Sequence, residues 1–98
     1  MTLEFEGPVI YWRGPAPFYF IKVPAKESAE LKGIERLATY GWGVIPATVR
    51  VGETEWTTSL FPKDGSFLVP VRAVVRKSLK LEEGDSAAVR LEVAVNPA

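Results

Sequence analysis

The chain has 98 residues, of which 47% are hydrophobic and 24% are charged, a length and composition that predict one soluble globular domain over residues 1–98. Its 12 lysines and arginines balance 12 aspartates and glutamates, and a zero formal charge argues against a general nucleic-acid or membrane-surface binder. The sequence contains no cysteine or histidine, which excludes disulfides, thiolate metal sites, thiol nucleophiles and the commonest general base.

The N-terminal part of the chain predicts a β-hairpin. Residues 2–13 alternate between apolar and polar side chains, which is the period-two pattern of a half-buried strand. Gly7 and Pro8 interrupt this pattern and indicate a bulge or an edge position, because proline cannot donate to a ladder. Residues 18–23 form a second strand rich in residues that favour sheets, and a turn at residues 14–17 should pair it with the first strand.

A helix is expected over residues 25–38, because Pro24 ends the second strand and the apolar period then changes. The side chains at helical spacing are Leu31, Ile34 and Leu37. Glycine has a low helix propensity, so Gly33 predicts a short or broken helix.

A second hairpin is expected in the middle of the chain. Residues 44–51 and residues 55–61 both alternate in polarity, and Gly52 favours a tight turn between them. On this pattern the side chain of Trp56 points into the core.

The C-terminal third predicts a strand, a helix and a strand. Residues 67–69 form a short strand that Pro70 stops, residues 71–80 form a helix, and residues 87–95 form the most regularly alternating strand. The apolar stripe of that helix comprises Val71, Val74, Val75 and Leu79.

Two stretches of the chain share the order strand, proline, helix, glycine turn and strand. The matching points are Val23-Pro24 in the first stretch and Val69-Pro70 in the second. We interpret this order as a duplication that gives the fold a pseudo-two-fold axis; the alternative is a chance recurrence of a common pattern.

The sequence also resembles known families. Residues 67–93 resemble the AbrB/MazE-type swapped-hairpin motif, in which a strand ending in proline is followed by a basic helix, a Gly-Asp turn and a strand. Over nearly its full length the chain resembles the uncharacterised small proteins of the domain-of-unknown-function (DUF) family 1905. The matching pieces, in order, are Gly41-Trp42-Gly43, the run from Trp56 to Pro62, Lys63-Asp64-Gly65, Leu68-Val69-Pro70, Val75-Arg76-Lys77 and Gly84-Asp85. This resemblance implies an all-β fold, a double-split β-barrel with two short capping helices, and no established activity.

The candidate binding residues combine an aromatic side chain with basic ones, and they are Trp42, Arg50, Arg72, Arg76 and Lys77. No acidic residue interrupts residues 72–80, so the second helix presents a basic face. Exposed tryptophan and arginine are common in binding hot spots, and Trp12 beside Arg13 is a further candidate platform. The alternatives are that Trp42 packs in the core and that the basic face is simply solvated.

An acidic turn near the C-terminus is expected to be structural. Glu82, Glu83 and Asp85 lack the repeated spacing of a calcium-binding loop, and Asp85 should instead bond to neighbouring backbone amides. We expect no metal and no cofactor.

These observations predict a non-catalytic binding or interaction module whose ligand is an unidentified protein or small molecule. The alternative is an AbrB-like DNA-binding transcription regulator or antitoxin-like protein, which the resemblance of residues 67–93 favours and the zero net charge disfavours. An enzyme would have to be a carboxylate-based hydrolase, because the hydroxyls of residues 57–59 have no histidine to activate them. We expect a monomer or weak homodimer in the cytoplasm with no membrane partner, because the N-terminus lacks the pattern of a signal peptide.

Overall fold

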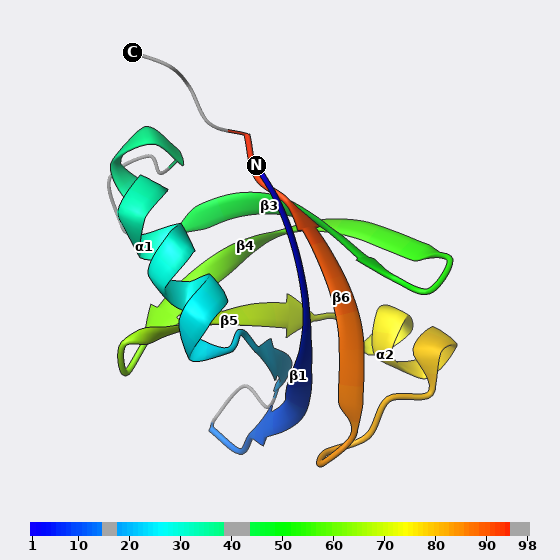
Figure 1. Cartoon of the computed structure of the whole chain (residues 1–98). Coiled ribbons are helices and arrows are strands. Elements are labelled where there is room, and N and C mark those ends of the chain that lie inside the picture. Colours follow the sequence, from blue (N-terminus) through cyan, green and yellow to red (C-terminus); the bar gives the residue numbers. More distant parts are fainter. Residues whose placement is uncertain (15–17, 39–43, 95–98) are drawn as a thin grey trace.

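The structure, a computed structural model, describes residues 1–14, 18–38 and 44–94. Within these residues the strands close into an antiparallel barrel in the order β1-β2-β5-β4-β3-β6, and the two helices lie on opposite sides of it (Figure 1). The elements are β1 (Thr2–Trp12), β2 (Phe18–Lys22), α1 (Ala25–Ala38), β3 (Ile45–Val51), β4 (Thr54–Lys63), β5 (Ser66–Val71), α2 (Ala73–Leu79) and β6 (Ser86–Glu92). The predicted all-β barrel with two helices is confirmed.

Two long strands are each divided between two partners, which makes the barrel double-split. Residues 2–8 of β1 pair with β6, whereas residues 9–12 pair with β2. Residues 54–60 of β4 pair with β3, whereas residues 61–63 pair with β5. We call the β1–β6–β3–β4 part sheet A and the β1–β2–β5–β4 part sheet B.

The change of partner in β1 follows directly after Gly7 and Pro8. Of the two alternatives predicted for these residues, a bulge or an edge position, the bulge is absent. The ladder with β6 runs without interruption to Pro8, which lies opposite Ser86. Gly7 is buried, and a Cβ atom at this position would collide with the carbonyl oxygen of Lys22 in β2. A glycine is therefore needed where β1 leaves sheet A and approaches β2.

The helix α1 packs against β5 and β3 and runs unbroken past Gly33. Gly33 is exposed, with open space where a Cβ would lie. Its low helix propensity therefore destabilises the helix by roughly 1 kcal/mol relative to alanine. Leu31 is fully buried and Ile34 packs against the core, and this burial outweighs the cost. The expectation of a short or broken helix was therefore wrong.

A buried serine fastens α1 to the barrel. The Ser28 hydroxyl donates a hydrogen bond to the Val23 carbonyl oxygen at 3.1 Å and accepts one from the Phe67 amide at 3.2 Å. Because Ser28 is buried, these bonds satisfy backbone groups that water cannot reach.

Pro70 does not end β5, which continues to Val71. The Pro70 carbonyl accepts a hydrogen bond from the Trp56 indole in β4 at 3.2 Å, so the backbone polar atoms of Pro70 face β4. The β4–β5 ladder has already ended at Leu68 on this side. The absent proline N–H therefore removes no ladder bond. Because β5 takes up Val71, the helix α2 begins two residues later than predicted, and Val74 lies 81% exposed instead of in an apolar stripe.

The core fills the barrel with the inward side chains of all the described strands. Trp56 is buried as predicted, and β3, β4 and β6 contribute inward residues at every second position. The buried apolar residues are Leu3, Val9, Ile21, Val23, Leu31, Ile45, Ala47, Val49, Trp56, Leu60, Phe67, Leu68, Val69, Val71, Leu81, Ala87, Val89, Leu91 and Val93.

The strand order carries the symmetry that the repeat predicted. Exchanging β1, β2 and β3 for β4, β5 and β6 leaves every neighbour relation of the closed ring unchanged. The helices differ more, since α1 has 14 residues and α2 has 7. The topology therefore agrees with a pseudo-two-fold axis, which passes between β2 and β5 in sheet B and between β3 and β6 in sheet A; its origin in a duplication stays a prediction.

Several predicted features fall outside the described residues. These are most of the turn at residues 14–17, the Gly41-Trp42-Gly43 segment and the side chain of Leu37. The last strand was predicted to reach Val95, but β6 already ends at Glu92, and the described residues Val93 and Ala94 lie outside it.

Candidate functional site

The structure places the predicted binding residues in different surroundings. Trp42 lies outside the described residues. Arg50 is on β3, where it lines a cleft with residues of β1 and β6. Arg72, Arg76 and Lys77 belong to α2 or its N-terminal boundary, and Arg76 packs over β2.

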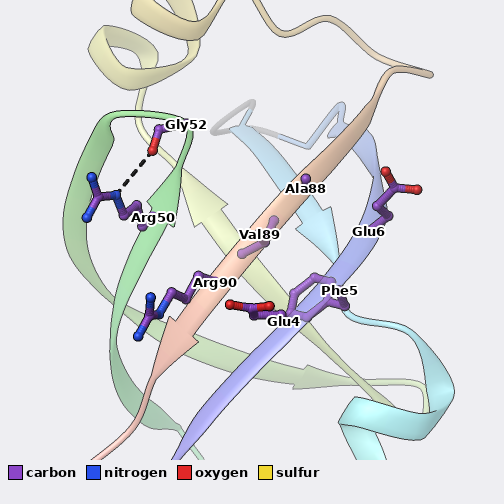
Figure 2. A pocket seen from close by; sticks show the side chains of 8 residues that line it. All are labelled: Glu4, Phe5, Glu6, Arg50, Gly52, Ala88, Val89 and Arg90. Atoms are coloured by element: carbon purple, nitrogen blue, oxygen red, sulfur yellow. Dashed lines mark hydrogen bonds between the residues drawn. The ribbon is translucent and has the colours of Figure 1, made fainter.

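The cleft beside Arg50 has a volume of about 540 Å³. It opens because β3 pairs with β6 only as far as Arg50 and Arg90, after which the strands separate. Phe5 and Val89 give the cleft an apolar part. Figure 2 shows the Arg50 and Arg90 side chains on neighbouring strands and the Glu4 carboxylate pointing toward β6.

The charges at this cleft form a balanced ladder across sheet A. Glu4 lies opposite Arg90, Arg90 opposite Arg50, and Arg50 opposite Glu55. Arg50 Nε also donates a hydrogen bond to the Gly52 carbonyl oxygen at 3.1 Å, and Arg90 Nη2 lies 3.4 Å from a Glu92 carboxylate oxygen. Two positive charges thus stand between negative ones, and exposed cross-strand pairs of this kind contribute a few tenths of a kcal/mol each. The ladder gives the cleft no net preference for an anion.

Arg76 packs against aromatic rings instead of facing solvent with the other basic residues of α2. Its guanidinium carbon lies 4.3 Å from the centre of the Tyr19 ring, and Nη1 donates a hydrogen bond to the Leu81 carbonyl oxygen at 3.2 Å. Tyr19 stacks on Tyr11 with ring centres 4.7 Å apart, and Arg13 lies 5.5 Å from the centre of the Tyr11 ring. Arg76, Tyr19, Tyr11 and Arg13 thus form a column in which two cations enclose two stacked rings. This column stabilises the packing of α2 against the β1–β2 hairpin.

This packing reduces the basic face of α2. Arg72, Lys77 and Lys80 remain exposed, whereas the Arg76 guanidinium is engaged with Tyr19 and Leu81. Tight DNA binding typically needs about 6–10 phosphate contacts. The helix of one chain offers a small part of that number, so DNA binding stays a prediction, and its support is weaker than it was from the sequence alone.

The acidic turn is structural in the way that the sequence indicated. Asp85 Oδ2 accepts a hydrogen bond from the Glu82 amide at 2.9 Å, and the Asp85 amide donates to the Glu82 carbonyl oxygen at 3.0 Å. Among the described residues no group of three or more aspartates and glutamates lies close enough together to hold a metal ion.

An aromatic groove is lined by residues of β1, β2, β4 and β5, and the β4–β5 hairpin lies on the same side of the barrel as β2 (Figure 1). The groove has a volume of about 380 Å³. We use the name aromatic groove for the surface formed by the described residues that line it, which are Trp12, Phe18, Phe20, Phe61, Pro62, Lys63 and Leu68.

The groove is on the outer face of sheet B. Trp12 lies opposite Phe18, and Phe61 opposite Leu68, while the alternate residues Ile21 and Leu60 are fully buried in the barrel. The exposed fractions of the side chains are 48% for Trp12, 36% for Phe18 and 46% for Phe61. Antiparallel sheets usually present polar residues on the face turned to water, and clustered apolar residues there commonly mark interaction sites.

A lysine is the charged residue of the groove lining. Lys63 Nζ lies 4.1 Å from the centre of the Trp12 ring, a cation–π contact that joins the two hairpins. Trp12 is thus exposed as the sequence suggested, but its cationic neighbour in space is Lys63 and not Arg13, which packs on Tyr11.

One feature of the sequence indicates this groove and was not used in the predictions. In residues 18–23 both alternating sets are apolar: Phe18 and Phe20 on one face, and Ile21 and Val23 on the other. A strand with two apolar faces in an antiparallel barrel has one apolar face left for water or a partner. That this face continues onto Phe61 depends on strand order, which the sequence does not show directly.

The described residues thus define an all-β protein with a double-split antiparallel barrel, a charged ladder on one outer face and an aromatic groove on another. A family model described as a domain of unknown function (DUF1905) matches residues 5–91, and the chain belongs to this family. No curated protein matches the chain, and the AbrB/MazE-type resemblance of residues 67–93 stays a prediction. None of the helices in the described segments has the length and apolar character needed to cross a membrane.

Proposed function

We propose that this protein is a non-catalytic binding module that takes up an apolar ligand in the aromatic groove. The observation that carries the proposal is the joint exposure of Trp12, Phe18 and Phe61 on one outer face of the barrel. Scattered single apolar residues on a surface are ordinary, but a contiguous aromatic set is typical of recognition surfaces.

The area involved suits reversible binding. From the exposed fractions of these three side chains, a ligand would cover roughly 300 Å² of apolar surface, or about 7 kcal/mol at 25 cal/mol per Å². A similar area of the ligand would be covered too, while association costs about 4–15 kcal/mol. The surplus supports a complex that forms and dissociates readily.

The described lining residues support binding and not catalysis. Six of these seven are apolar, and the seventh, Lys63, lies over the Trp12 ring. Acid–base chemistry needs at least one group of suitable pKa within hydrogen-bonding reach of a substrate, and these described residues offer neither a carboxylate nor a hydroxyl as a partner for Lys63.

The test uses the neutral solvatochromic dye Nile red with the intact chain. We expect the wild-type protein to shift the dye emission to the blue and Phe61→Ser to weaken dye binding at least about fivefold, because it removes a wall of the groove. The control is Val74→Ser, which removes from α2 an apolar side chain that is more exposed than that of Phe61 and should leave dye binding unchanged. Equal dye binding by Phe61→Ser and wild type, with circular dichroism showing both folded, contradicts the proposal.

A further inference from the structure

The charges around the aromatic groove indicate what kind of ligand it takes, an inference that rests on the proposed function. Lys63 is the charged residue among those that line the groove. Lys22 is exposed on β2 and lies opposite Leu68, which also lines the groove. Lys63 therefore lines the groove, and Lys22 shares the outer face of sheet B with it.

Among the residues that the structure describes, neither of these lysines forms an ion pair. Lys63 contacts the Trp12 ring, and within the described part of the chain no carboxylate pairs with Lys63 or Lys22. The nearest acid in the sequence, Asp64, follows Lys63 in the β4–β5 turn and makes no ion pair with it. In sheet A, by contrast, each arginine of the ladder lies opposite a glutamate.

We infer that the aromatic groove binds a short apolar segment of a partner protein that carries acidic residues beside its apolar side chains. The rings would cover the apolar side chains, and Lys22 and Lys63 would meet the carboxylates at the edge. Complementary charges at the rim of an apolar contact favour the right partner and disfavour a partner of the wrong sign.

The shape of the groove favours a protein segment over a small molecule. Ligand pockets usually bury 70–90% or more of a small molecule, whereas this groove lies on the outside of the barrel and its rings are exposed to one side. A groove open along one side suits a chain that continues beyond both ends of it.

The same charges disfavour a second copy of this chain as the occupant. A two-fold dimer through the groove would place equivalent surfaces face to face, and Lys22 and Lys63 of one copy would approach the same lysines of the other. Like charges brought together at an apolar interface are destabilising.

The test compares three synthetic peptides that share one apolar core of leucine and phenylalanine and carry glutamate, glutamine or lysine flanks. Isothermal titration calorimetry at low salt should show the glutamate-flanked peptide binding about tenfold more tightly than the lysine-flanked one, with the glutamine-flanked peptide between them. The double variant Lys22→Glu/Lys63→Glu should abolish or reverse this order. The control Arg72→Glu/Lys77→Glu makes the same change of net charge on α2 and should preserve it.

The outcomes separate this inference from the proposed function. Equal binding of all three peptides that is lost in Phe61→Ser overturns the acidic partner and leaves the apolar site standing. Absence of any peptide binding, together with absence of Nile red binding, overturns both. Sedimentation that shows a wild-type dimer and a Phe61→Ser monomer overturns the acidic partner in favour of a second copy.

Discussion

The outer faces of sheet A and sheet B lie at the two ends of one pseudo-two-fold axis, and their chemistry is opposite. Where β3 meets β6 in sheet A, the outward residues form the charge ladder of Arg50, Arg90 and their glutamates. Sheet B, built around the pairing of β2 with β5, instead carries the aromatic groove. One topology therefore presents a surface on which opposite charges lie in register with one another and a surface on which apolar area is left uncovered.

This difference separates what the fold needs from what it leaves available. The opposite charges of the ladder balance one another in number, so sheet A offers a partner no net charge. The rings of the aromatic groove add to the exposed apolar area, while their strand neighbours Ile21 and Leu60 already fill the core. Since folding does not require an apolar outer face, the groove is the surface that function best explains.

The largest expected effect distinguishes two adjacent residues of β4. Leu60→Ala should lower the free energy of unfolding by about 2–5 kcal/mol, because it opens a cavity in the core, whereas Phe61→Ala should lower it by less than about 1 kcal/mol. Urea denaturation of both variants measures the difference. If Phe61→Ala proves as damaging as Leu60→Ala, the groove is part of the folding core and the contrast between the two faces is lost.

A smaller but still substantial loss is expected where β1 passes from sheet A to sheet B. Gly7→Ala places a methyl group against the Lys22 carbonyl oxygen, and because that atom belongs to the backbone, the variant should lose about 2–3 kcal/mol of stability. Gly33→Ala is the matched control, since its Cβ meets open space in a helix and should add up to about 1 kcal/mol. If thermal unfolding shows no difference between Gly7→Ala and wild type, then β1 and β2 can move apart at Gly7 without loss of stability, which contradicts this prediction.

An intermediate effect is expected at the column that holds α2. Arg76→Met removes the guanidinium from the Tyr19 ring and its bond to the Leu81 carbonyl, so we expect a loss of about 1–2 kcal/mol and faster hydrogen exchange in α2. Lys77→Met, at an exposed neighbouring position, should change neither. Arg76→Lys should recover little, because an ammonium cannot stack as a planar guanidinium does. Exchange rates in α2 that stay at the wild-type value in Arg76→Met would show that the column does not hold the helix.

The sequence predicted the inner face of the barrel better than the outer one. Trp56 was placed inward correctly, because the period of two determines which side of each strand faces the core. The prediction that Val74 lies in an apolar stripe was wrong. The pattern assigned Val71 to the helix, whereas β5 continues through Pro70 to Val71.

The aromatic groove and the Arg76 column needed information that no local pattern holds. Phe18 and Phe61 belong to hairpins far apart in the sequence, and they share a groove because β2 and β4 both pair with β5. Arg76 was assigned to a polar helix face, since the sequence could not show that Tyr19 would lie beneath it. Side-chain partners across strands depend on register, and register comes from the closed barrel as a whole.

The smallest expected effect tests the two faces with salt. Arg90→Gln removes the attraction to Glu4 and Glu92 but also the repulsion from Arg50, so it should change the free energy of unfolding by at most about 0.5 kcal/mol at low salt. At about 1 M sodium chloride, where the screening length falls to about 3 Å, the difference from wild type should vanish. Nile red binding to the groove should persist under the same conditions, because apolar burial does not depend on charge. Two results would contradict this contrast between an electrostatic and an apolar face. One is a stability change in Arg90→Gln that persists at high salt, and the other is Nile red binding that is lost at high salt.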